Sequence, residues 1–167
     1  MRFAFEDEQL ELADAVRDLL IREVPASRVR EAWDSDDGRL HDVWAKLADM
    51  GVLGLMVPEA HGGFGLSEEE LVLALTECGR VALPDPVLSS AMVVAPMLAE
   101  VIGQEHPPEG AVELATTWLE RLPGGATAVP AFPAAKTVAF ANSADLIIGY
   151  ADGELHVVDP SSVRLSP

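Results

Sequence analysis

The chain has 167 residues, of which 49% are apolar and 23% are charged, and its formal net charge at pH 7 is −17. This balance is typical of a folded chain with one good core or two small lobes. The 11 Lys and Arg residues form no cluster, so the composition argues against binding to nucleic acid or to an anionic membrane. No run reaches the roughly 18 apolar residues of a membrane helix. The single cysteine, Cys78, is expected to be a small buried apolar residue, which fits a cytoplasmic protein.

The first predicted helix covers about Glu6–Glu23, and Pro25 ends it. Acidic residues fill its first turn, as the helix dipole favours, and they stand where a secretory signal would need its apolar core. Residues 24–38 have a mixed pattern, and the run that starts at Trp33 indicates a charged turn. The apolar stripe of the helix consists of Leu12, Val16, Leu19 and Leu20.

A second helix is predicted over Leu40–Met50, because Val43, Trp44 and Leu47 recur on one face with Met50. Gly51 stands where a helix end takes a left-handed conformation at little steric cost. A buried apolar connector over residues 52–57 follows, and Pro58 prevents the helix from continuing.

The glycine-rich stretch Gly62-Gly-Phe-Gly65 predicts a tight turn whose backbone path side chains would obstruct. Ser67, with Glu70 three residues later, forms a capping box. A third helix is therefore predicted over Ser67–Gly79. The stretch does not follow a strand in a βαβ unit, so it gives little support to a phosphate site.

A fourth helical region is predicted over Val87–Gly103, and Pro96 inside it indicates either two short helices end to end or one bent helix. A fifth helix is predicted over Ala111–Leu122, and Gly124-Gly125 ends it.

Beyond Gly125 the pattern changes to short apolar runs that are typical of strands, and Asp152-Gly153 indicates a hairpin. The predicted fold class is α+β, with a helical lobe over residues 1–124 and a short antiparallel β segment over residues 125–167. The predicted strands are Thr127–Phe132, Thr137–Phe140, Ala144–Tyr150, Leu155–Val158 and Val163–Leu165.

The string from Trp44 to Ser67, with Val57-Pro-Glu59 and Gly62-Gly-Phe-Gly65 in this order, resembles the N-terminal helical domain of the acyl-CoA dehydrogenase family. The opening Phe5-Glu-Asp-Glu-Gln9 and the pair Ala95-Pro96 also resemble that family. In the family this string shapes the fold and carries no chemistry. The resemblance implies FAD as cofactor, an acyl-CoA thioester as substrate, and homo- or hetero-oligomeric assembly.

The resemblance also implies where the chemistry would lie. The family's catalytic glutamate belongs to a later helical domain, so no catalytic residue is expected within this chain. The flavin-contacting strand of the family carries a Thr, and its nearest match here is Phe140, Ala141 and Asn142, in which Ala141 has no hydroxyl group. A second flavin motif, a Gly-Ser-Asp loop after the first strand, is replaced by Pro130-Ala-Phe-Pro-Ala-Ala135.

In the family, the helix with the Ala-Pro pair helps to form the acyl-chain pocket. Helical steps back from Pro96 place Met92, Leu88 and Asp85 on or near one face, so these three are the candidates to line an acyl cavity. Ordinary core packing is nevertheless the favoured explanation for Met92 and Leu88, since an apolar stripe on a helix usually marks the core. The neighbouring Ser89 and Ser90 either leave room for a bulky acyl group or lie exposed.

Two interpretations remain open. The chain is a subunit, or the N-terminal part of one, of an FAD-dependent acyl-CoA dehydrogenase that introduces an α,β double bond. Alternatively, it belongs to a non-catalytic subunit that pairs with a catalytic one. The acyl group stays undetermined among fatty, branched, polyketide and sterol side-chain thioesters.

Overall fold

The computed structural model describes residues 4–132, 135, 137–151 and 154–162. The α-helices are α1 (Asp7–Glu23), α2 (Ala26–Trp33), α3 (His41–Asp49), α4 (Glu68–Arg80), α5 (Ala95–Gly103) and α6 (Ala111–Arg121). Short 3-10 turns are η1 (Val52–Gly54), η2 (Glu59–His61) and η4 (Pro160–Ser162), and η3 (Leu88–Val94) is a π-helix. The strands are β1 (Ala128–Ala131), β2 (Leu146–Ala151) and β3 (Glu154–Val158).

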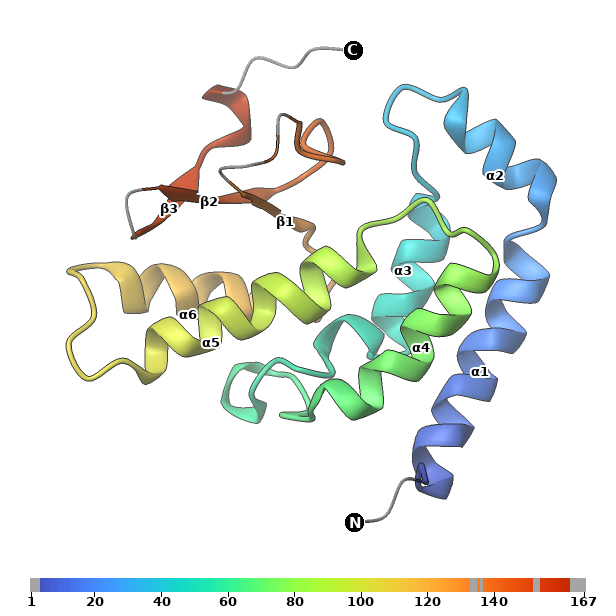
Figure 1. The fold of residues 1–167 in the computed structure, drawn as a ribbon, viewed down its shortest axis with the longest axis horizontal. Coiled ribbons are helices and arrows are strands. Elements are labelled where there is room, and N and C mark those ends of the chain that lie inside the picture. Colours follow the sequence, from blue (N-terminus) through green and yellow to red (C-terminus); the bar gives the residue numbers. More distant parts are fainter. Residues whose placement is uncertain (1–3, 133–134, 136, 152–153, 163–167) are drawn as a thin grey trace.

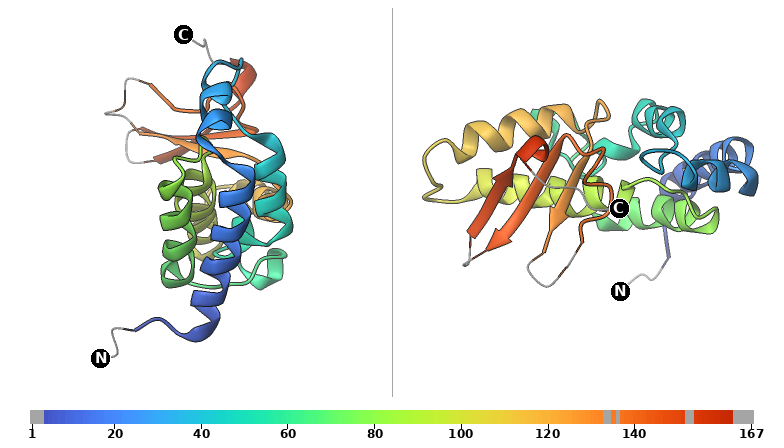
Figure 2. Two further views of the ribbon diagram at one scale, coloured as in Figure 1. Left: turned by 90° about the vertical axis from the view of Figure 1, so that its right-hand side faces the viewer. Right: turned by 90° about the horizontal axis from the view of Figure 1, so that it is seen from above.

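The helices form two groups and the sheet lies on one of them. Helices α1, α3 and α4 pack together, and α5 and α6 form a second pair (Figure 1). The sheet lies across α5 and α6, as the view from above shows (Figure 2). The helical run of η3 and α5 connects the two groups, because η3 contacts both α4 and β1.

Two apolar cores correspond to the two groups. The larger one gathers side chains from α1 to α4 and from η1, among them Leu20, Leu47 and Leu71. The second joins α5 and α6 to the sheet through residues such as Leu98, Leu119 and Ile148. The fold class, a helical part followed by a small sheet, is thereby confirmed. The division at residues 124 and 125 stays a prediction.

The helices predicted from periodicity are present within one residue at each end. Helix α2 was not predicted individually, because residues 24–38 have a mixed pattern. It has only eight residues and buries only Val29 and Ala32, too short an apolar pattern to stand out from its charged neighbours. Arg28 holds it in place by donating to the Glu23 carbonyl at 2.8 Å and to Asp42 at 2.6 Å.

The helical region around Pro96 is one continuous run and not two separate helices. The run begins as the π-helix η3, in which the Ala95 amide donates to the Ser90 carbonyl, and changes to α-helix at Ala95. Pro96 therefore occupies the first turn of α5, where its missing amide hydrogen is tolerated. The wider π turn takes up the mismatch that a proline causes inside a helix.

The sheet is mixed, whereas the sequence predicted an antiparallel one. Strands β1 and β2 are parallel, with Ala128 opposite Leu146, and only β2 and β3 are antiparallel. The predicted strand Thr137–Phe140 is wrong: these residues form bends and turns, and Phe140 has a φ of +60°. The hairpin residues 152–153 and the predicted strand Val163–Leu165 lie outside the described residues.

The glycine-rich turn has the crowded backbone path that the sequence predicted. Gly62 and Gly65 have φ values of +83° and +63°. A Cβ atom on Gly63 would lie 2.1 Å from the Val57 carbonyl oxygen and 2.6 Å from that of Gly54. Both contacts are with backbone atoms, so no side chain can move aside to relieve them. Gly63 is thus required by close packing of the turn against η1.

We expect Gly63→Ala to destabilise the protein by at least about 2 kcal/mol, because the turn must shift to admit a methyl group. Gly79→Ala is the matched control, since a Cβ there meets no atom within 4 Å. As a helical glycine in α4, Gly79 should give a gain of about 0.5–1 kcal/mol on the same change. Urea unfolding of both variants measures the difference, and equal effects would contradict the packing argument.

A buried carboxylate joins α1 to α4. Glu77 is only 4% exposed and accepts from Arg80 Nε at 2.8 Å and from Arg17 Nη2 at 3.2 Å. These two guanidinium groups lower the pKa of Glu77 from 4.5 to about 2. A carboxyl group whose pKa is lowered on folding stabilises the folded state at pH values above its unfolded pKa.

The contribution of Glu77 should therefore be complete above about pH 4.5 and be lost as the pH falls towards about 2. Glu77→Gln should cost about 1–3 kcal/mol at neutral pH and reduce the loss of stability across that acidic range. Chemical unfolding measured between pH 2 and 7 tests this, with Glu120→Gln on the exposed face of α6 as control. A parallel pH profile for wild type and Glu77→Gln would contradict it.

Candidate functional site

A buried ion pair lies where the two helical groups and the sheet meet. The side chains of Arg39 and Asp85 are 1% and 0% exposed, and Arg39 Nε donates to Asp85 Oδ1 at 2.8 Å. Asp85 Oδ2 also accepts from the Leu40 amide at 3.2 Å. Burial raises the pKa of the Asp85 carboxyl group, and the adjacent guanidinium opposes that rise. The pair is therefore held by direct hydrogen bonds in a water-poor environment.

Arg39 extends this cluster to the sheet. Its Nη1 donates to Thr127 Oγ1 at 2.9 Å and to the Ser143 carbonyl at 3.4 Å. The guanidinium carbon lies 4.7 Å from the ring centre of Trp44, in the range of a cation–π contact. Trp44 in turn donates from Nε1 to the Gly125 carbonyl at 2.7 Å. One arginine thus links α3, the start of β1 and the loop before β2.

Ser90 makes a second link between η3 and β1. Its Oγ donates to the Ala128 carbonyl at 2.8 Å and accepts from the Ala128 amide at 3.0 Å. Ser90 is 1% exposed, so the alternative that it lies exposed is wrong. On the edge of β1 that does not pair with β2, the hydrogen-bonding groups of the Ala128 backbone are therefore paired with the side chain of Ser90.

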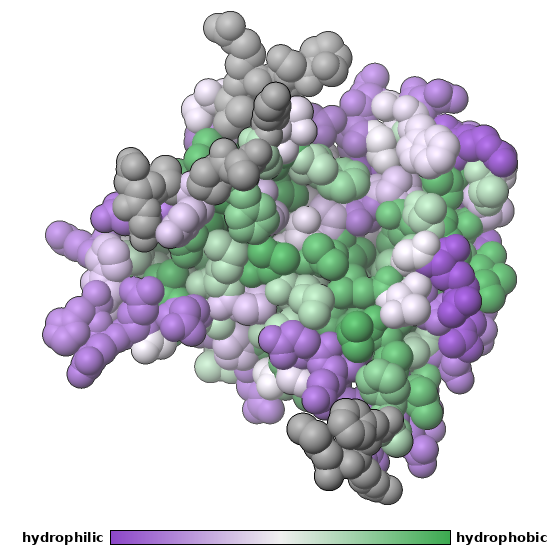
Figure 3. Space-filling view, in the orientation of Figure 1, coloured by the Kyte–Doolittle hydropathy of each residue, from purple (hydrophilic) through white to green (hydrophobic). Residues whose placement is uncertain are grey.

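The three acyl-pocket candidates have different environments. Asp85 is in the ion pair described above, and both its oxygens accept hydrogen bonds. Leu88 is 54% exposed, and Met92 is half-buried against the larger core. On the face of the molecule that Figure 3 shows, apolar side chains gather in the middle, over η3 and α4. That these three residues line an acyl pocket stays a prediction.

The flavin candidates Phe140, Ala141 and Asn142 lie in the turn before β2, not on a strand. The Phe140 carbonyl accepts from the Ser143 amide at 3.1 Å, and Asn142 Nδ2 donates to the Asp36 carbonyl at 3.3 Å. Ala141 has no polar side-chain atom. The Phe140 carbonyl and the Asn142 amide nitrogen are thus engaged within the chain, and no side-chain hydroxyl is present, so these three residues alone do not fit a flavin. Their assignment stays a prediction.

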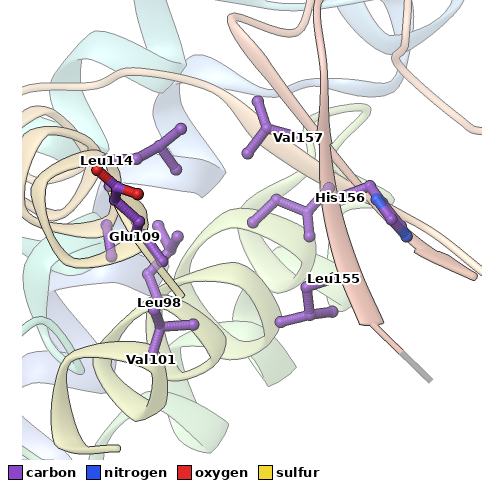
Figure 4. A pocket seen from close by; sticks show the side chains of 11 residues that line it. Leu98, Val101, Glu109, Leu114, Leu155, His156 and Val157 are labelled. Atoms are coloured by element: carbon purple, nitrogen blue, oxygen red, sulfur yellow. The ribbon is translucent and has the colours of Figure 1, made fainter. Parts of the chain in front are cut away.

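A groove of about 400 Å³ lies between β3 and the helices α5 and α6. Leu98, Val101 and Leu114 reach into it from the helix side, opposite Leu155 and Val157 of β3 (Figure 4).

The polar groups of the groove are few. The Glu109 carboxylate lies on the helix side, and the imidazole of His156 points to the other face of β3 (Figure 4). This lining suits an apolar group and supplies no nucleophile. The groove was not predicted from the sequence, although the alternation of Leu155 and Val157 in β3 is a signal for it.

Other functional classes find no support in the described part of the chain. It contains no cluster of three or more His, Cys, Asp or Glu residues that could hold a metal ion. No described helix is long and apolar enough to cross a membrane. Burial raises the pKa of the Cys78 thiol to about 12, so this cysteine stays protonated and unreactive, as expected of a packed apolar residue.

We expect Ser90→Ala to destabilise the protein by about 1–3 kcal/mol, because it leaves the amide and carbonyl of Ala128 buried without this partner. Ser89→Ala is the control: Ser89 is half-buried beside Ser90, and the same change there should stay within about 0.5 kcal/mol. Denaturant unfolding compares the two. A Ser90 variant as stable as the Ser89 variant would show that the link to β1 contributes nothing.

The chain is similar in sequence to two known proteins. The chain is 29% identical over 94 residues to acyl-CoA dehydrogenase IpdE2 of Mycobacterium tuberculosis, which covers 56% of this chain and 30% of that protein. It is 27% identical over 103 residues to acyl-CoA dehydrogenase IpdE2 of Mycolicibacterium smegmatis, covering 61% and 32%. The chain therefore matches about a third of the length of these relatives.

Two solved structures have a similar fold. One is a variant of the Tcur3481–Tcur3483 steroid ACAD, with a TM-score of 0.72 and 23% identity. The other is the ChsE4–ChsE5 complex from Mycobacterium tuberculosis, with a TM-score of 0.73 and 20% identity. They cover 92% and 94% of this chain, which spans 48% of each. At these identities the likeness concerns the fold alone.

The family model of the acyl-CoA dehydrogenase N-terminal domain matches residues 6–106, from the start of α1 to the end of the η3–α5 run. This range includes the Trp44–Ser67 string on which the resemblance depended. The chain belongs to the acyl-CoA dehydrogenase family.

Proposed function

We propose that this chain is the N-terminal part of a subunit of an FAD-dependent acyl-CoA dehydrogenase, which introduces an α,β double bond into an acyl-CoA thioester. The observation that carries the proposal is the family match over residues 6–106. The chain would supply the helical wall beside the acyl group, with Leu88 and Met92 as its candidate contacts. The catalytic base would come from outside residues 1–167.

We further propose that flavin binding depends on a partner subunit. Residues Phe140, Ala141 and Asn142 offer no hydroxyl group to a flavin, and the Phe140 carbonyl and Asn142 Nδ2 already have partners. Both structural neighbours are described by a pair of protein names, Tcur3481–Tcur3483 and ChsE4–ChsE5. A hetero-oligomer in which the second subunit provides most flavin contacts accounts for both observations.

The second candidate is a non-catalytic structural subunit that stabilises a catalytic one. The alanine at position 141 favours it, because this position would give a hydroxyl group to the flavin in the resemblance described above. Under either candidate the compartment we propose is the cytoplasm. Because one neighbour is described as a steroid ACAD, a sterol side-chain CoA thioester is the first substrate to test, beside a straight-chain fatty acyl-CoA.

The test is to purify the full-length protein alone and together with each dehydrogenase subunit encoded beside it, and to record the visible flavin spectrum. We expect no visible flavin absorption for the protein alone and the absorption of an oxidised flavin for one complex. Anaerobic addition of the substrate thioester should then bleach that absorption.

The outcomes separate the two candidates. Bleaching that is abolished when this subunit is replaced by a variant with Leu88 and Met92 both changed to Ala, while the complex stays assembled, supports a direct role at the acyl group. Unchanged bleaching supports the structural subunit. Absence of flavin from the protein and from every complex would overturn the proposed function.

A further inference from the structure

We infer that Arg39 is a positioning residue that holds the turn Phe140–Ser143 in a fixed place relative to the segment Asp85–Met92. Nothing in the family resemblance points to this arginine, which precedes the Trp44–Ser67 string. The inference rests on the proposed function in one respect: these two segments are the candidate flavin side and acyl side of one site.

The hydrogen bonds of Arg39 divide between the two segments. On one side Nε donates to Asp85 Oδ1 at 2.8 Å, three residues before Leu88. On the other side Nη1 donates at 2.9 Å to Thr127, and at 3.4 Å to the carbonyl of Ser143, the residue directly after Asn142. These partners are 46, 88 and 104 residues away in the chain. The side chain of Arg39 thus fixes the distance between the Asp85–Met92 segment and the Phe140–Ser143 turn, which no local structure determines.

The segment just before Arg39 makes an independent contact with the same turn. The Asp36 carbonyl accepts from Asn142 Nδ2 at 3.3 Å. The Thr127 carbonyl accepts from the amides of Asp145 and Leu146 at 2.8 and 3.2 Å, and Asp145 Oδ2 accepts from the Thr127 amide at 2.8 Å. Thr127 therefore passes the constraint from Arg39 to the residues that lead from the turn into β2.

The chemistry of the site requires arginine rather than any cation. A guanidinium group donates from several nitrogens in one fixed plane and can stack on an aromatic ring, as Arg39 does on Trp44. The ammonium group of lysine is a single point with three donors, and it cannot reach Asp85 and Thr127 on opposite sides while it lies over the ring.

The cluster is also a costly way to gain stability. Arg39 Nη2 is buried and has no hydrogen-bond partner among the described residues, and an apolar replacement of a buried ion pair is often at least as stable. A role in fixing geometry explains why a charged group occupies this place.

The first experiment is hydrogen exchange on the full chain carrying Arg39→Lys. Lysine can keep the pairing with Asp85 but loses the bonds to Thr127 and Ser143. We expect exchange of the Ser143, Asp145 and Leu146 amides to become at least about tenfold faster. Amides of α1 and α4 should change less than about threefold, because their packing does not involve Arg39.

Arg121→Met is the matched control. Arg121 also lies over a tryptophan, 4.2 Å from the ring centre of Trp118, but on the surface of α6. Its loss removes an arginine and a ring contact without touching the turn, so the exchange of the Ser143, Asp145 and Leu146 amides should stay at the wild-type rate. Thr127→Val is the second test variant: it removes the hydroxyl acceptor while the Arg39–Asp85 pair remains, and it should reproduce the local effect if the lysine variant does not fold.

Three outcomes decide the inference. Faster exchange confined to residues 143–146 in both test variants supports it. Wild-type exchange in the turn, or an equal increase throughout the chain, would overturn it, since the arginine would then be dispensable or only a general stabiliser. Because these measurements need no flavin, absence of flavin from every wild-type complex would refute the proposed function without affecting this result.

Discussion

The arrangement of this chain depends on one buried ion pair. Neither Arg39 nor Asp85 can be buried alone without a large desolvation cost, so each requires the other in place. Their pairing joins the loop before α3 to the loop before η3, which are 46 residues apart. The same carboxylate accepts from the Leu40 amide, the N-cap residue of α3. A negative charge at a helix N-terminus is favourable, so Asp85 replaces the side-chain cap that α3 lacks.

The sheet is positioned from this same junction. Thr127 and Ala128, at the start of β1, receive one contact from Arg39 and two from Ser90, and β2 is then placed by pairing with β1. Helices α5 and α6 support the inner face of β2, where Leu146 and Ile148 are buried. They do not reach under β3, where Leu155 and Val157 on the same face stay 41% and 46% exposed. The groove is the consequence of this incomplete coverage.

The sequence allowed the helical part to be predicted because the signals there are local. Periodicity, the Ser67–Glu70 capping box and Gly51 at a φ of +80° all act within one or two helical turns. The prediction was wrong where the deciding partner is distant. Residues 137–140 have a strand-like composition. The turn that follows them is held instead by hydrogen bonds from Arg39 to Ser143 and from Asn142 to Asp36.

The candidate site was only partly accessible from the sequence for the same reason. Helical steps back from Pro96 singled out Asp85 without its partner, because Arg39 lies in a segment with no pattern of its own. The fourth helix was correctly located but its type was not, since a π turn depends on how η3 meets β1 and α4. Likewise, no local signal in β1 or β2 indicates that these two strands pair in parallel.

The charge of the chain bears on how such a subunit would work. Its described basic residues are largely engaged with its own acids: Arg17 and Arg80 with Glu77, and Arg28 and Lys46 with Glu23 and Asp42. Arg39 is enclosed with Asp85. Both an acyl-CoA and FAD carry several negative charges, and a chain of net charge −17 repels them at long range. Cations that hold these phosphates would then come from another part of the assembly. This electrostatic requirement, independent of any motif, supports the proposal that the site is completed by a partner.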